Sequence, residues 1–116
     1  MRRTDFKGKR IKRKLIKCSE VFKAFDDVQN TLGEILDNNS NIIEIKCNVP
    51  LEDSSIGDYT TDFVCTKEDG SIMVRECVYR KLLLRPKTIT LLDFSQRYWL
   101  QRGVTDWKVV IDCEKE

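Results

Sequence analysis

The 116-residue chain contains no histidine, and its five cysteines lie far apart in the sequence with no C-x-x-C pair. Zinc fingers use closely spaced cysteines, alone or with histidines, and histidine is the commonest general base, so neither zinc-finger chemistry nor histidine-based catalysis is expected. Four of the five cysteines fall in or at the end of an expected strand. This placement and the odd number favour reduced, buried thiols over a disulfide framework. The five are Cys18, Cys47, Cys65, Cys77 and Cys113.

The chain also lacks any apolar run near the roughly 20 residues that span a bilayer. Its basic N-terminus is not followed by the apolar segment of a secretory signal. Hydrophobic residues make up 41% of the chain and charged residues 34%, as in ordinary globular proteins. We therefore expect a cytoplasmic protein that does not bind a membrane, built as a single domain.

The net charge of +2 is distributed unevenly along the chain. Residues 1–17 contain nine Lys or Arg and a single acid, whereas the remainder contains 12 basic and 18 acidic residues. A dense basic block is the usual electrostatic footprint of nucleic-acid binding, and the alternative is a solvated tail that only aids solubility. We expect residues 1–18 to form an arm that orders only against a phosphate backbone, as a helix near residues 11–17. The DNA-binding candidates are Arg10, Lys12, Arg13 and Lys14.

The pattern of residues 19–116 predicts one domain with the order helix, three strands, helix, strand. Ser19 is a plausible N-cap for the first helix, and Pro86 and Gly103 bound the second. Ile89, Leu92, Ser95 or Gln96, and Trp99 are expected to turn inward on that second helix. The segments 58–66 and 72–78 carry apolar groups on both faces, which favours a sheet with helices on both sides. The expected helices are 19–37 and 86–103, and the expected strands are 42 to 49 or 51, 58–66, 72–78 and 107–112.

The hairpin of residues 58–66 and 72–78 carries one carboxylate on each strand. Residues 68–70, Glu-Asp-Gly, fit a three-residue loop whose Gly adopts the left-handed conformation. That loop places Asp62 opposite Glu76 with Cβ atoms about 5 Å apart, where like charges need a compensating group such as Mg²⁺. A two-residue loop would instead place the two acids on opposite faces. Turn chemistry alone leaves both registers open.

The order of elements, an acid on the first helix and the carboxylates on the hairpin together resemble the core of the PD-(D/E)xK nucleases. Within that superfamily, residues 59–63 (Tyr-Thr-Thr-Asp-Phe), 68–70 (Glu-Asp-Gly) and 98–104 resemble the N-terminal endonuclease domain of the TnsA transposase subunits. The resemblance covers residues 25–112. It implies an α/β, restriction-endonuclease-like αβββαβ core, and it favours the register in which Asp62 faces Glu76.

The resemblance also implies a metal-dependent DNA endonuclease in a transposition or mobile-element system. Its catalytic residues would be Glu34 on the helix, Asp62, and Glu76 of the E-x-K element. Asp62, Glu76 and the backbone carbonyl of Cys77 would hold one or two Mg²⁺ or Mn²⁺ ions. Such ions activate water and stabilise phosphate charge, so the site needs no histidine. The implied partners are DNA and a second transposase or recombination subunit, and a homodimer is an alternative assembly.

The chain departs from the family pattern at Val78, which stands where the nucleases have a lysine. Valine neither donates a hydrogen bond nor stabilises charge, and the loss of such a group typically costs on the order of a hundredfold in rate. Lys81 is the first candidate to replace the lysine, ahead of Arg80 and Lys46. The alternative function is a catalytically degenerate nuclease fold that binds DNA or a partner without cutting.

Overall fold

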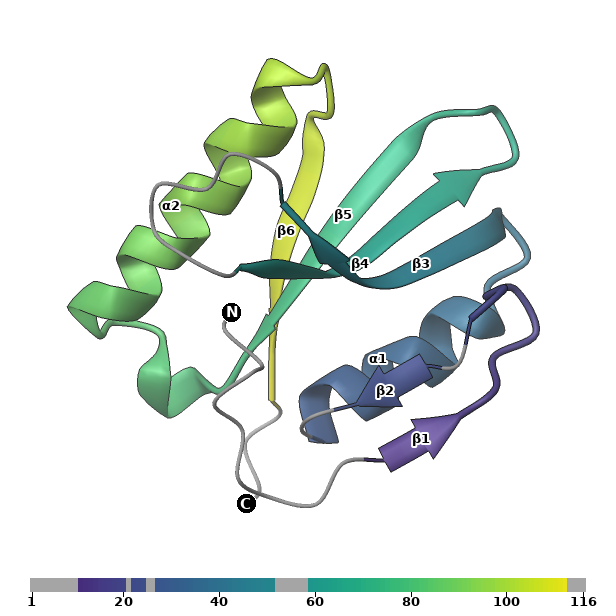
Figure 1. The fold of residues 1–116 in the computed structure, drawn as a ribbon, viewed down its shortest axis with the longest axis horizontal. Coiled ribbons are helices and arrows are strands. Elements are labelled where there is room, and N and C mark those ends of the chain that lie inside the picture. The colour runs from purple at the N-terminus through teal and green to yellow at the C-terminus, as the bar shows by residue number, and fades with distance from the viewer. Residues whose placement is uncertain (1–10, 21, 25–26, 52–58, 113–116) are drawn as a thin grey trace.

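The computed structural model describes residues 11–20, 22–24, 27–51 and 59–112 (Figure 1). It is an α/β structure with a four-stranded mixed sheet, two α-helices and a separate two-stranded ribbon. The elements are β1 (Ile11–Arg13), β2 (Phe22–Ala24), α1 (Asp27–Asp37), β3 (Ile42–Pro50), β4 (Thr60–Lys67), β5 (Ile72–Val78), the 3₁₀ turn η1 (Arg80–Leu82), α2 (Pro86–Gln101) and β6 (Asp106–Ile111).

The four-stranded sheet has the order β3-β4-β5-β6. The first three strands are joined antiparallel in chain order, and β6 is parallel to β5. A parallel neighbour needs a crossover connection, which α2 provides. From α1 onward the order is therefore αβββαβ, as the sequence predicts. No helix among the described residues is long and apolar enough to span a membrane.

The N-terminal part of the prediction is wrong in two places. The first helix begins at Asp27 rather than near Ser19, and residues 11–17 contain a strand rather than a helix. Strands β1 and β2 pair antiparallel, and β2 alternates buried, exposed, buried. Three residues are too few to distinguish this period of two from the helical spacing of the apolar residues that follow, so the sequence pattern predicts one helix. Leu15 and Cys18 are buried, so this part of the basic segment packs onto the body. Residues 1–10 lie outside the described residues.

Helix α2 begins and ends where local chemistry predicts. Pro86 is its first residue, and Gly103 follows its end with φ +81°, a conformation that glycine adopts without steric cost. Of the expected inward residues, Leu92 and Ser95 are buried and Trp99 is half-buried, but Ile89 is 50% exposed. Two overlapping stripes satisfy helical spacing in this segment, and packing selects one of them. The buried stripe is Thr88, Leu91, Leu92 and Ser95.

The two helices cover opposite faces of the sheet, as expected. Met73 and Cys77 of β5 share a hydrophobic cluster with residues of α1. The intervening Glu76 instead contacts α2, and successive strand residues point to opposite faces. Leu91 of α2 packs in a second cluster with Leu51 and Tyr59. Residue 76 therefore lies on the face of the sheet beneath α2.

The cysteines in the described residues are free thiols, as expected. Cys18, Cys65 and Cys77 are buried and Cys47 is half-buried. The Sγ atoms of Cys18 and Cys47 lie 3.8 Å apart. Burial is the main reason that the thiol pKa of Cys65 is raised to about 12. Cys113 lies outside the described residues.

Candidate active site

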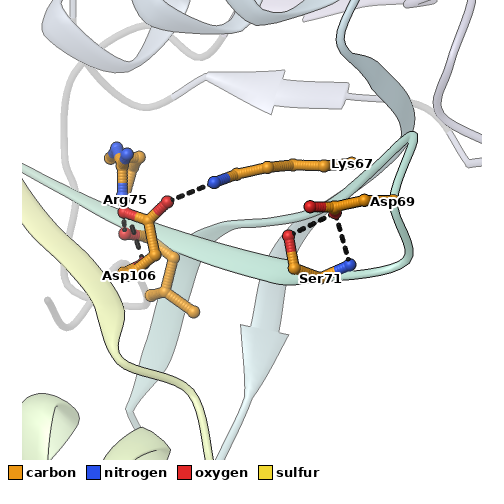
Figure 2. Close-up of polar contacts among 6 residues, drawn as sticks. Lys67, Asp69, Ser71, Arg75 and Asp106 are labelled. Carbon is orange, nitrogen blue, oxygen red and sulfur yellow. Dashed lines mark hydrogen bonds and ion pairs between the residues drawn. The ribbon is translucent and has the colours of Figure 1, made fainter.

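The hairpin turn between β4 and β5 has the predicted three-residue loop (Figure 2). The Lys67 N–H donates to the Ser71 carbonyl at 2.9 Å, and Gly70 has φ +85°. Asp69 Oδ1 accepts hydrogen bonds from the N–H and the hydroxyl of Ser71. The alternative two-residue loop is therefore excluded. The resulting pairs are Phe63↔Arg75, Val64↔Val74, Cys65↔Met73 and Thr66↔Ile72.

Asp106, at the start of β6, ties this hairpin to the parallel edge of the sheet (Figure 2). Its carboxylate accepts Lys67 Nζ at 2.6 Å and lies 2.9 Å from Arg75. The hydrogen bond from Lys67, together with that from Arg75, holds the pKa of Asp106 below its ordinary value. A surface pocket of about 460 Å³ opens beside this cluster, between the turn and the end of α2. Neither Asp62 nor Glu76 lines that pocket.

The same register brings Asp62 and Glu76 together. Asp62 N–H donates to Glu76 Oε1 at 2.9 Å, and Cys77 N–H donates to Asp62 Oδ2 at 2.7 Å. Each carboxylate thus bonds to the backbone of the opposite strand, at the point where the β4–β5 pairing stops. Both side chains are 0% exposed. The predicted convergence of the two acids is therefore present, within an enclosed site.

Glu76 has further donors on its second oxygen. Oε2 accepts the Tyr59 hydroxyl at 2.7 Å and the Ser95 hydroxyl at 2.5 Å. The indole Nε1 of Trp107 donates to Ser95 Oγ at 3.0 Å, which orients that hydroxyl toward Glu76. Tyr59 immediately precedes β4, Ser95 lies on α2 and Trp107 lies on β6. The carboxylate consequently joins elements that are distant in the sequence.

Burial is the main reason that the pKa of Glu76 is raised, and the charge of Asp62 raises it further. Two enclosed carboxylates disfavour double ionisation, so a proton or a cation at the pair relieves the repulsion. Burial also raises the pKa of Tyr59, and Glu76 adds to that shift. The phenol therefore stays protonated and serves as a hydrogen-bond donor.

Glu34, the expected third carboxylate, is exposed on α1. The preceding Gly33 faces β2, where a Cβ would lie 2.6 Å from Phe22 Cε2. One residue further along a helix rotates by about 100°, which turns Glu34 away from that contact. Within the described ranges, no three His, Cys, Asp or Glu side chains gather in an arrangement able to hold a metal. Glu34 is therefore not placed with the Asp62–Glu76 pair.

The lysine position of the nuclease pattern is occupied by an enclosed valine. Val78 is 2% exposed at the end of β5. Lys81, its expected substitute, is exposed on η1 with Nζ 5.9 Å from the centroid of the Tyr79 ring. Arg80 and Lys46 are also exposed. Cys77 contacts Asp62 through its backbone N–H, which donates a hydrogen bond, whereas the predicted metal ligand is its backbone carbonyl.

The candidate arm residues have different placements. Lys12 is exposed on β1, and Arg13 belongs to the same strand. Lys14 Nζ donates to the carbonyls of Cys18 and Ser19, so it braces the turn that follows β1. Arg10 lies outside the described residues.

Sequence reasoning missed Tyr59 and Ser95 as partners of Glu76, and Trp107 as the partner of Ser95. Ser95 carried a signal, because a hydroxyl within the apolar stripe of α2 needs a buried partner. Tyr59 and Trp107 carried no such signal, since their polar atoms are attached to aromatic rings that also suit an apolar core. Comparison of the sequence with models of protein families and with curated proteins gave no match.

Proposed function

We propose that this chain is a metal-dependent DNA endonuclease with a PD-(D/E)xK-type core, similar to the N-terminal domain of TnsA. The observation that carries the proposal is the enclosed Asp62–Glu76 pair, with each carboxylate bonded to the opposite strand. The αβββαβ order and the mixed sheet β3-β4-β5-β6 support the same assignment. The proposed reaction is phosphodiester hydrolysis within a transposition or mobile-element system.

The chemistry of the pair suits Mg²⁺, which favours one or two carboxylates over an all-protein cage. Asp62 and Glu76 would hold the ion, with the Cys77 carbonyl as the further ligand implied by the family. When bound, such an ion activates water and stabilises charge on the phosphate. The raised pKa of Glu76 supports this role, because a cation that binds there replaces a proton.

The residues around the pair have distinct positioning roles in this proposal. The N–H groups of Asp62 and Cys77 hold the two carboxylates in a fixed relative orientation. The hydroxyls of Tyr59 and Ser95 occupy Glu76 Oε2 and must turn away to expose it. Opening of the site therefore depends on α2, which carries Ser95.

The test is nicking of supercoiled and branched DNA by the wild type and by Asp62→Asn. Mg²⁺ or Mn²⁺ should support nicking by the wild type, and the substitution should lower the rate at least about a hundredfold. Lys87→Gln, an exposed substitution on α2, is the control for handling and folding. Absence of both nicking and calorimetric Mg²⁺ binding in the wild type would contradict the endonuclease assignment.

A second candidate function is a degenerate nuclease fold that binds DNA without cutting it. The observation that favours it is Val78, which is enclosed where the family has its lysine. Salt-dependent DNA binding without Mg²⁺ binding would support this alternative, whereas Mg²⁺-dependent nicking would exclude it.

A further inference from the structure

The β1–β2 ribbon carries a concentration of positive charge. Residues 11–24 contain five basic residues and one acid, although the chain as a whole is close to neutral. The basic residues are Lys12, Arg13, Lys14, Lys17 and Lys23, and the acid is Glu20. Figure 1 shows this ribbon beside α1 and below β3.

Lys12 and Lys23 occupy directly opposite positions in the antiparallel ribbon. Both side chains are exposed, whereas Phe22 and Ala24, which alternate with Lys23, are 0% exposed. The two lysines therefore project from the outward face of the ribbon. Like charges directly opposite one another destabilise a strand pair unless an opposite charge compensates. Neither lysine belongs to an ion pair among the described residues.

The backbone beneath the two lysines is firmly anchored. Asn48 Nδ2 donates to the Lys23 carbonyl at 2.8 Å, and Gln29 Nε2 donates to Asn48 Oδ1 at 2.7 Å. The Phe22 ring packs against the Phe63 ring with centroids 5.5 Å apart. A short ribbon on its own is marginally stable, but these contacts join it to α1, β3 and β4. The ribbon that carries the two ammonium groups is thus joined to the body of the fold through β2.

We propose that the outward face of the ribbon, through Lys12 and Lys23, binds backbone phosphates of duplex DNA. The choice of DNA as the polyanion rests on the proposed function. Lysine contacts to phosphate position a protein on the duplex without reading its sequence.

The test is the salt dependence of binding of a short duplex to Lys12→Gln/Lys23→Gln, measured by fluorescence anisotropy. EDTA in the buffer separates binding from cleavage. Each phosphate contact contributes about 0.9 to the slope of log K against log salt, so the double variant should lose about 1.8. The charge-preserving variant Lys12→Arg/Lys23→Arg should keep the wild-type slope.

The matched control is Lys87→Gln/Lys108→Gln, which removes the same charge from exposed positions on α2 and β6. An unchanged slope in the ribbon variant would overturn the proposal. Equal losses in the two double variants would do the same, because they would show an effect of net charge alone. A loss seen only with duplex RNA would also overturn it. Wild type that binds duplex DNA in EDTA, but neither nicks DNA nor binds Mg²⁺ when the metal is supplied, would contradict the endonuclease assignment and leave the ribbon proposal intact.

Discussion

Asp62 donates its backbone N–H to Glu76 Oε1 at 2.9 Å, so the acid of β5 takes the place of a strand carbonyl. Cys77 N–H returns the interaction by donating to Asp62 Oδ2. The two carboxylates therefore serve as backbone acceptors at the end of the β4–β5 pairing. This arrangement satisfies strand N–H groups and also concentrates negative charge in an enclosed space, so its stability depends on protonation.

Glu76→Gln should remove a pH dependence of stability. The carboxyl pKa is raised above its ordinary value of 4.5 in the folded protein, so folding favours the protonated form. The contribution of the Glu76 carboxyl to the free energy of unfolding is fully present below pH 4.5 and is lost as the pH rises through the folded-state pKa. Urea denaturation at a series of pH values should show that decline in the wild type and not in Glu76→Gln. Parallel curves for the two proteins would disprove the role of this titration.

Ser95→Ala should destabilise the fold by about 1–3 kcal/mol, because it removes a donor to Glu76 and the acceptor of Trp107 Nε1. Ser71→Ala is the matched control, since Ser71 is exposed at the hairpin turn. Thermal or urea unfolding measures both variants. The prediction is wrong if the two substitutions have equal effects.

Val78→Lys should increase Mg²⁺-dependent nicking if the pair is the active site. Residues 76 and 78 of a strand share a face, so the new ammonium projects to the same side as Glu76. A cation there lowers the pKa of Glu76 and supplies the charge that the family lysine provides. Val78→Met controls for side-chain length without charge. Initial rates measured at equal protein concentration decide the outcome, and no gain over Val78→Met would contradict it.

Gly33→Ala should destabilise the contact between α1 and β2. The added Cβ would lie 2.6 Å from Phe22 Cε2 and 2.8 Å from Cζ, and that ring is fully buried. Overpacking of this kind costs about 1–3 kcal/mol, partly offset by a gain of about 1 kcal/mol in helix propensity. The double variant Gly33→Ala/Phe22→Leu should show favourable coupling in urea unfolding. Additive effects would indicate that the ring is not the obstacle.

The sequence by itself determined the features set by short-range chemistry. Gly70 permits the left-handed residue that closes a three-residue loop, and this loop fixes which strand residues face each other. Pro86 and Gly103 likewise set the limits of α2 through their backbone preferences. The order αβββαβ follows from such local patterns, whereas turn chemistry left two registers open and the structure decided that Asp62 lies beside Glu76.

Only the tertiary structure decided the features that depend on contacts between distant residues. The strand β2 is three residues long, and its burial depends on Phe22 meeting α1 and β4. The inward stripe of α2 was selected by its packing partners, because two stripes satisfied the same helical period. The donors to Glu76 include Tyr59 and Ser95, 17 and 19 residues away in the sequence. Such hydrogen bonds depend on how the helix packs on the sheet. Residue types and their spacing along the chain do not show which of these distant groups will meet.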